Sequence, residues 1–251
     1  MRILFYNIRY GTGSDWDYHL PLPFTGFFRK TSARIRRIGR FVDSMEPDII
    51  CLVEVDGGSY RHDSYCQAGQ LASMKGREHK FSCKYGSESP LKRLPILSSH
   101  GNALLSSIPI LSSQECYFSR GVKKTFLSVE FQDFHVVLSH LSLGRQARKI
   151  QLWELARHCS LLSKPVILGG DLNLLHGPSE MRPLMQETSL KDTDKLARPT
   201  FPSRKPKLRL DYLLASEGIT VNNVEIPGVR LSDHLPVICD FTPGKNRQGD
   251  S

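Results

Sequence analysis

Motifs that mark several common enzyme classes are missing from this chain of 251 residues. It contains no Cys-x-x-Cys pair, no His-Glu-x-x-His sequence, no Gly-x-x-x-x-Gly-Lys-Ser/Thr loop and no Gly-x-Ser-x-Gly turn. These motifs build thiolate or histidine zinc sites, nucleotide-binding P-loops and the nucleophile turn of serine hydrolases. The chemistry of this chain must therefore come from side chains spread along the sequence.

Long hydrophobic runs are also absent. No segment approaches the ~20 apolar residues that a membrane-spanning helix needs. Arg2 leads directly into the first expected strand, which leaves no room for a signal peptide. The six cysteines, at positions 51, 66, 83, 116, 159 and 239, are irregularly spaced, which favours reduced core residues over a disulfide framework. We therefore expect a cytoplasmic protein.

The charge is unbalanced toward the basic side. Lys and Arg number 34 against 25 Asp and Glu, and the net charge of +9 gives a pI near 9.3. A basic surface favours polyanionic partners, although the same excess also serves ordinary solubility. The length and the absence of internal repeats predict a single domain over residues 1–242, followed by a flexible tail at 243–251.

Strands and helices alternate along the chain. Residues 2–7 form an apolar strand, and Ser32 is the expected N-cap of a helix in which Ile35, Ile38 and Val42 recur at helical spacing. Pro47 ends this helix before a strand at 48–53. Further strands are expected at 80–85, 101–106, 114–118 and 165–169, an antiparallel pair between 124 and 138, and helices within 62–76 and 145–162, the latter burying Ile150, Trp153, Leu155, Ala156 and Leu161.

Polar side chains stand where these apolar runs end. They are Asn7, Glu54, His140, Asp171 with Asn173, and the pair Asp233 and His234. Strand ends deliver side chains to the edge of a sheet, so we expect these groups to converge. Carboxylate and amide oxygens are ligands for a hard divalent cation, and imidazoles bond to phosphoryl oxygens. The pattern suits phosphoester chemistry.

Seven short stretches carry a resemblance to a known family. They are Tyr6–Arg9, Pro47–Val55, Gly101–Ser106, Leu138–Leu141, Gly170–Asn173, Arg209–Leu214 and Leu231–Val237. In this order they resemble the endonuclease/exonuclease/phosphatase superfamily, the metal-dependent phosphoesterases that include DNase I. The resemblance implies an α+β fold, a four-layer α/β/β/α sandwich of two mixed, mainly antiparallel sheets with the site at one end.

The resemblance also implies roles for single residues. Asn7, Glu54 and Asp233 would hold Mg²⁺, with Mn²⁺ as a substitute. Asp171 would orient or deprotonate the attacking water, supported by Asn173. His234, oriented by Asp211, and His140 would contact the phosphate or the leaving group. Substrate contacts are expected from Asn102 and from Arg120, with Lys123 and Lys124 as competitors for the role of Arg120.

Two segments bear on the substrate. The loop Gly11–Lys30 interleaves aromatic and basic residues, which suits nucleic acid, a lipid surface or a packed surface loop. The basic segment Arg198–Arg209 leads toward the site. We expect a monomeric nuclease acting on DNA; the alternatives are a phosphoesterase for phospholipid or a small metabolite, and a non-catalytic binding module. Endo or exo action and the preference for monoester or diester stay open.

Overall fold

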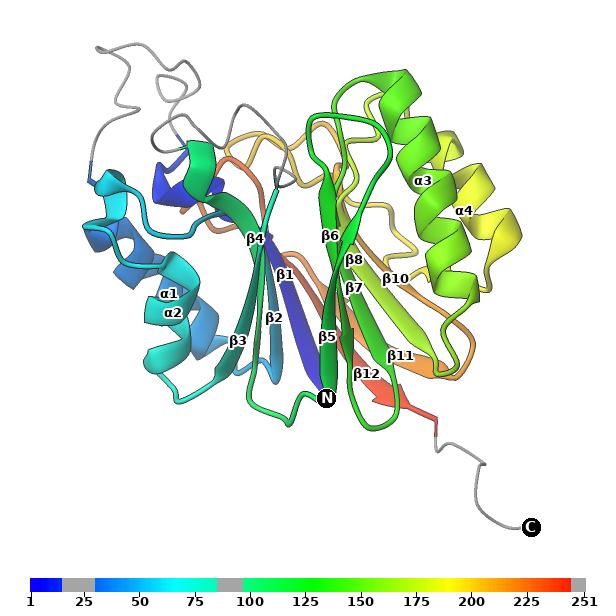
Figure 1. Cartoon of the computed structure of the whole chain (residues 1–251), viewed down its shortest axis with the longest axis horizontal. Coiled ribbons are helices and arrows are strands. Elements are labelled where there is room, and N and C mark those ends of the chain that lie inside the picture. Colours follow the sequence, from blue (N-terminus) through cyan, green and yellow to red (C-terminus); the bar gives the residue numbers. More distant parts are fainter. Residues whose placement is uncertain (15–29, 85–96, 245–251) are drawn as a thin grey trace.

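Two six-stranded sheets pack face to face in the computed structural model, with helices on the outer faces (Figure 1). The structure describes residues 1–14, 30–84 and 97–244. The predicted α+β sandwich is confirmed. Most of the loop Gly11–Lys30 lies outside the described residues, so its expected contacts stay predictions.

The first sheet contains both ends of the described chain. Its strands are β1 (Arg2–Asn7), β2 (Ile49–Asp56), β3 (Glu78–Cys83), β4 (His100–Ser106), β11 (Ile219–Glu225) and β12 (Val237–Pro243). Their order is β11-β12-β1-β2-β4-β3, and only the pairing of β1 with β2 is parallel. A parallel pair needs a crossover, and helix α1 (Ser32–Ser44) provides it.

The second sheet repeats this plan. Its strands are β5 (Ser112–Tyr117), β6 (Thr125–Glu130), β7 (His135–His140), β8 (Val166–Asp171), β9 (Lys191–Asp192) and β10 (Asp211–Ala215). They follow the order β5-β6-β7-β8-β10-β9, and β7 and β8 are the parallel pair. Helix α3 (Arg145–Ser160) is their crossover. The chain also forms α2 (Gln67–Ser73), α4 (Arg182–Glu187) and the short 3-10 helices η1 (Arg9–Gly11), η3 (Tyr60–His62), η5 (Leu97–Ser99) and η6 (Pro178–Met181).

The core lies between the sheets because strand residues alternate between the two faces. Ile3 and Phe5 of β1 point inward and pack in one cluster with Val136 and Leu138 of β7. The intervening Leu4 belongs to the cluster under α1. Strands buried on both faces explain the continuous apolar runs in the sequence.

Helix α1 buries the stripe that its periodicity predicts. Ile35, Ile38 and Val42 face the first sheet. The N-cap position falls on Thr31, one residue before the predicted Ser32. The Ser32 hydroxyl instead donates to Asp63 Oδ2 at 2.7 Å. This serine therefore tethers the loop after β2.

Helix α3 departs from the expected burial. Trp153 is 52% exposed and Leu161, beyond the helix end, is 78% exposed, so both predicted core positions are wrong. Arg148 and Gln151 are fully buried instead. Arg148 donates to the carbonyls of Ser142 and Leu143, and Gln151 to the loop before β6. The need of these loop carbonyl groups for hydrogen-bond donors thus decides which face of α3 is buried, rather than the spacing of its apolar residues.

The two sheets are joined by hydrogen bonds at one end. The Lys124 amide donates to the Lys84 carbonyl oxygen at 2.8 Å, and the Thr125 hydroxyl donates to the Cys83 carbonyl oxygen at 2.8 Å. These bonds connect the end of β3 in the first sheet with the start of β6 in the second. This is also the end at which the predicted site residues lie.

The C-terminal strand is slightly longer than expected. Strand β12 reaches Pro243, the first residue of the predicted tail, and 245–251 lie outside the described residues. All six cysteines fall in the described part of the chain and none is paired in a disulfide. Among the helices that the structure describes, none has the length and apolar character to cross a membrane.

Candidate active site

Strand directions bring the predicted site residues together. The parallel pairs β1–β2 and β7–β8 end at the same edge of the sandwich, and β10, antiparallel to β8, begins there. In the register, His140 lies opposite Asp171, which in turn lies opposite Asp211. Each of these three side chains is buried. Polar groups far apart in sequence therefore share one position in the fold.

Asp171 is the hub of this cluster. Its Oδ2 accepts a hydrogen bond from Asn7 Nδ2 at 3.0 Å and lies 3.3 Å from His140 Nε2 and 3.9 Å from His234 Nε2. The side chain is almost completely buried. The Asp171 carboxylate thus lies against an amide from the first sheet and imidazoles from two different segments.

His234 is held by a second carboxylate. Asp211 Oδ2 lies 2.8 Å from His234 Nδ1, the contact that the Arg-Leu-Asp-Tyr motif leads one to expect. The backbone amides of Leu210 and Asp211 donate to the Thr200 hydroxyl at 3.3 Å. A carboxylate on Nδ1 fixes the orientation of the ring, so Nε2 faces Asp171.

Asn173 adopts a left-handed backbone conformation with φ of 50°. An extended Asp171–Asn173 segment, which would place both side chains on one side, is therefore not formed. The Asn173 amide donates to Asp171 Oδ1 at 3.2 Å in an Asx turn, and its Nδ2 donates to the Leu141 carbonyl oxygen at 2.9 Å. Asn173 thereby ties the end of β8 to the end of β7.

The charges in this cluster shift one another. Burial alone would raise the pKa of Asp171, but His140, His234 and Lys123 hold it well below its ordinary value. Burial alone would lower the pKa of His234, but Asp211 and Asp171 raise it to about 10. Burial and the Lys123 ammonium lower the pKa of His140 to about 4. At neutral pH the site therefore contains one cationic and one neutral imidazole beside an ionised Asp171.

Glu54 occupies a β-bulge in β2. The register with β4 shifts between Val53 and Val55, and Glu54 has a φ of 56°. Such a conformation is costly for a residue with a side chain and is typical of functional sites. The carboxylate is half-buried and makes no hydrogen bond or ion pair with a described residue. Its charge faces the cations of Lys84 and Lys123.

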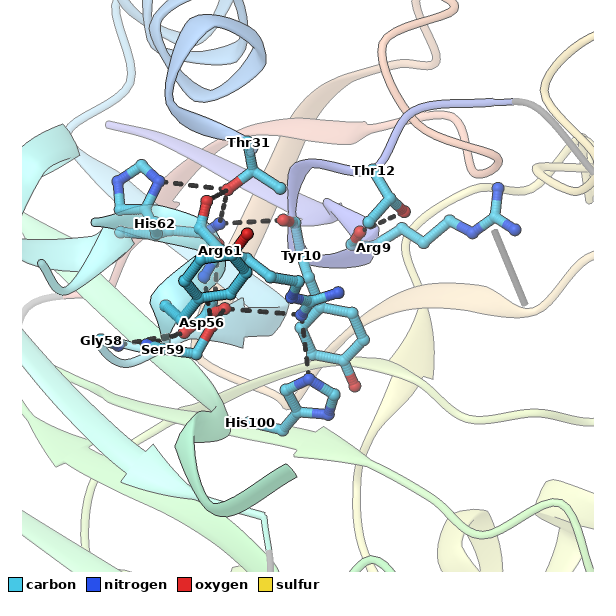
Figure 2. A network of polar contacts seen from close by, with 12 residues as sticks. Arg9, Tyr10, Thr12, Thr31, Asp56, Gly58, Ser59, Arg61, His62 and His100 are labelled. Atoms are coloured by element: carbon cyan, nitrogen blue, oxygen red, sulfur yellow. Dashed lines mark hydrogen bonds and ion pairs between the residues drawn. The ribbon is translucent and has the colours of Figure 1, made fainter. Parts of the chain in front are cut away.

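A polar network fixes the segment after this bulge (Figure 2). Asp56 Oδ1 accepts the amides of Gly58 and Ser59 at 3.0 and 2.7 Å, and Asp56 Oδ2 pairs with Arg61 at 3.4 Å. Arg61 also contacts His100 Nε2 at 3.0 Å. The His100 ring stacks on Tyr10 with centroids 3.7 Å apart. These contacts position Glu54 from the side of the first sheet.

Lys123, rather than Arg120, reaches the imidazoles. Its ammonium contacts His140 Nε2, whereas the Arg120 side chain is exposed and its carbonyl oxygen accepts from Gln151 Nε2 at 2.8 Å. The geometry favours Lys123 for the cationic role that the sequence assigned first to Arg120. Lys84, whose pKa burial lowers to about 8, is a second buried lysine that sequence reasoning missed. Its only signal was a position directly after a strand.

The other predicted residues lie around this cluster. Asp233 Oδ2 pairs with Arg9 Nε at 3.4 Å. Asn102 is fully buried on β4 opposite Val53, beside the bulge. Neither polar atom of its amide has a hydrogen-bond partner among the described residues. An unmatched buried amide next to a free carboxylate is the setting in which an ion or a substrate is bound.

A sequence profile of the Endonuclease/Exonuclease/phosphatase family matches residues 4–234. The chain belongs to this family. Its members are divalent-metal-dependent hydrolytic phosphoesterases, and this chain is an enzyme that acts on ester bonds. The matched range includes every predicted site residue, from Asn7 to His234.

Solved structures share the fold. The endonuclease/exonuclease/phosphatase of Beutenbergia cavernae has a TM-score of 0.72 at 20% identity, over 97% of this chain and 72% of that one. D. rerio TDP2 complexed with single-strand DNA product has a TM-score of 0.67 at 16% identity, over 96% and 98% of the chains. The mannosyl-6-phosphatase of Bacteroides thetaiotaomicron has a TM-score of 0.70 at 15% identity, over 96% and 99%. At such identities the likeness establishes the fold alone.

The donor set of this family member fits a hard divalent cation. Among the residues that the structure describes, none donates to or pairs with the Glu54 carboxylate, and the Asn102 amide on the neighbouring strand has no hydrogen-bond partner. Asp171, Asp211 and His234 also place one ligand atom each within 4.8 Å of one another. Oxygen ligands dominate both groups, as magnesium and manganese prefer.

The raised pKa of His234 has a measurable consequence for stability. The imidazole titrates near 6.5 when unfolded and near 10 when folded, so its stabilising charge is fully present below pH 6.5 and is lost as pH rises toward 10. Asp211→Asn removes a principal cause. We expect the free-energy difference of unfolding between the parent and this variant, measured by urea titration in EDTA, to be largest at pH 6.5 and to shrink toward pH 9.5.

A matched variant controls for the effect of losing one carboxylate charge anywhere on the protein. Asp133→Asn removes a carboxylate from the β6–β7 turn, far along the strands from the site. Its effect on unfolding should be independent of pH in the same window. A pH-independent difference for Asp211→Asn as well would show that the carboxylate does not raise the pKa of His234.

Proposed function

We propose that this enzyme hydrolyses phosphodiester bonds in nucleic acid, with DNA as the favoured substrate and Mg²⁺ as the cofactor that Mn²⁺ can replace. The observation that carries the proposal is the contact of the buried Asp171 carboxylate with Asn7, His140 and His234. A carboxylate held ionised among two imidazoles and an amide suits the orientation and deprotonation of an attacking water.

The surrounding residues divide the remaining work. His234, cationic at neutral pH, bonds to a non-bridging phosphate oxygen through Nε2 while Asp211 holds Nδ1. Lys123 offers a proton to the leaving oxygen, and the neutral His140, whose Nε2 the Lys123 ammonium contacts, positions it there. Asn173 keeps the ends of β7 and β8 in register through Leu141.

A bound metal would supply positive charge that offsets the negative charge on the phosphoryl oxygens. Glu54 is its principal ligand in this proposal, since among the described residues its carboxylate makes no hydrogen bond or ion pair, unlike those of Asp171, Asp211 and Asp233. Asn7 and Asp233 complete the predicted ligand set. Because Asp233 is paired with Arg9, we assign it to orienting its neighbours as much as to the cation.

Charge around the site supports a polyanionic substrate. Arg204, Lys205 and Lys207 are exposed on the segment that leads to Asp211, and the whole chain carries +9. One protein of the same fold was crystallised with a single-strand DNA product. We propose that the protein works as a monomer in the cytoplasm.

A second candidate is a phosphoesterase for phospholipid or a small phosphorylated metabolite. Val122, Leu143 and Leu175 are exposed aliphatic side chains on loops at the site end of the second sheet. Aliphatic tips beside cations suit a lipid surface. A mannosyl-6-phosphatase shares the fold. This candidate keeps the same hydrolytic residues.

A substrate panel tests the proposal. The purified protein is incubated with supercoiled, linear and single-stranded DNA, RNA, bis(p-nitrophenyl) phosphate and phospholipid vesicles, each with Mg²⁺, Mn²⁺ or EDTA. We expect metal-dependent cleavage of DNA that EDTA abolishes and that Asp171→Asn does not show. Turnover of lipid or the small ester alone would move the function to the second candidate. No turnover of any substrate would overturn both.

A further inference from the structure

A cavity of about 520 Å³ opens beside His234. Phe201, Pro202 and Leu208 form its apolar lining, and the charged side chains that line it are those of Arg204, Lys205, Lys207, Arg9 and Asp233. Its size falls in the range of small-ligand sites, which combine mostly apolar walls with a few polar groups. The reaction derived above uses none of its apolar wall.

Phe201 connects this cavity to the catalytic residues. Its ring centroid lies 4.8 Å from that of His234, with the planes tilted by 48°. The side chain is half-buried, so one part of the ring packs on the imidazole while Phe201 also lines the cavity. A group attached to a phosphate at His234 is therefore within reach of an aromatic surface.

The segment that carries Phe201 is a fixed hairpin. Phe201 and Leu208 form an antiparallel bridge, with the Phe201 amide donating to Leu208 at 2.9 Å and the Leu208 amide donating back at 2.8 Å. The Lys205 amide donates to the Pro202 carbonyl oxygen at 3.1 Å and closes the tip. The cations at the tip are thus held on an ordered turn.

This hairpin is bonded to the segment that carries His234. The Ser203 amide donates to the Asp233 carbonyl oxygen at 2.6 Å, and the Ser203 hydroxyl donates to Ser232 at 2.6 Å. The Leu235 amide donates to the Thr200 carbonyl oxygen at 2.8 Å. Bonds on both sides of His234 fix the distance between the aromatic ring and the catalytic centre, and such preorganisation lowers the entropic cost of binding.

We propose that this cavity is a subsite for the nucleobase next to the scissile phosphate, which stacks on Phe201, while Lys205 and Lys207 hold the following phosphate. The proposal rests on the proposed function and deepens it. A flat base followed by a phosphate suits a cavity that places an aromatic face beside exposed lysines, whereas an acyl chain would bring no partner for these cations. Stacking accepts any base, so the subsite favours unpaired strands without reading sequence.

Two small substrates isolate the base. Thymidine 5′-(p-nitrophenyl phosphate) and methyl p-nitrophenyl phosphate share a leaving group, and only the first carries a base. We expect Phe201→Ala to lower kcat/KM for the thymidine ester about 5- to 100-fold, mainly through KM, as for other base-stacking rings. The methyl ester should change less than twofold. Phe201→Trp should restore the thymidine ester, and Trp153→Ala, an exposed aromatic on α3, should change neither.

Direct binding makes the test independent of turnover. Thymidine monophosphate and methyl phosphate are each titrated into the protein by calorimetry. The parent should bind the nucleotide more tightly, and Phe201→Ala should bind both alike. Equal losses for both esters, or equal affinities in the parent, would overturn the subsite. If the enzyme shows metal-dependent turnover but the two affinities are equal, the proposed function stands and the subsite is overturned. If the affinities differ but no substrate is turned over, the subsite stands and the proposed function is overturned.

The lysine part of the proposal has its own test. Lys205→Ala with Lys207→Ala should weaken binding of a thymidine tetranucleotide and flatten its salt dependence, while thymidine monophosphate binding stays the same. Lys149→Ala with Lys191→Ala is the matched control, because both lysines are exposed and neither lines the cavity. If both double variants weaken tetranucleotide binding equally, Lys205 and Lys207 contribute only through the overall positive charge of the protein, and the phosphate contact is overturned.

Discussion

Asp171→Asn is expected to lower kcat by roughly 10³-fold while the variant keeps the native fold. The amide matches the carboxylate in shape and keeps the buried position between Asn7 and the two imidazoles. It cannot accept a proton from water, and it no longer attracts the positive charge of His234. The chemical step therefore loses its base and part of its electrostatic field together.

Steady-state kinetics on bis(p-nitrophenyl) phosphate, with circular dichroism melting alongside, measures both effects. Asp133→Asn is the control, since it makes the same chemical change in a turn away from the site. A variant that keeps more than a tenth of the parent turnover would remove Asp171 from the role of base. Loss of the native circular dichroism spectrum at the assay temperature would point to a structural role instead.

Glu54→Gln is expected to abolish the stabilisation that Mg²⁺ gives the folded protein. A ligand at about 100 times its Kd stabilises by about 2.7 kcal/mol, which for a chain of this size raises Tm by about 5 to 10 °C. Glu54 lies in a bulge of β2, its charge faces Lys84 and Lys123, and no described residue bonds to its carboxylate. Glutamine keeps the shape and loses the charge that binds the cation.

The measurement is Tm with rising Mg²⁺ or Mn²⁺, independent of any substrate. Glu217→Gln serves as the matched variant, because that carboxylate is exposed and paired only with Lys191 at 3.6 Å. We expect it to retain the full shift. An unchanged Tm shift in Glu54→Gln would show that the metal does not depend on Glu54 and would favour the cluster of Asp171, Asp211 and His234 as its site.

Much of the fold can be predicted from the sequence because buried apolar residues recur with the period of each helix or strand. The strand runs before Asn7 and Glu54 are apolar throughout, and helix α1 keeps its stripe of Ile35, Ile38 and Val42. The contact between Asp211 and His234 follows from the family resemblance, since 23 residues separate the two in the chain. Periodicity alone gave no reason to pair them.

Other features depend on contacts that no local pattern encodes. Arg148 and Gln151 are buried because loop carbonyls need donors, so α3 lost the core positions that its apolar residues predicted. Gln151 also binds the Arg120 and Lys123 carbonyls, and this loop geometry brings Lys123 to His140. The left-handed Glu54 is equally invisible in the sequence around it, because a bulge is set by pairing with β4.

The bond from the Lys124 amide to the Lys84 carbonyl joins the two sheets through main chain. Glu54 belongs to one sheet, while Asp171 and His140 belong to the other. Point substitutions replace side chains and leave such a link intact, except where proline removes the amide. Side-chain substitutions at Lys84 or Lys124 should therefore leave the two halves of the site in the same relative position.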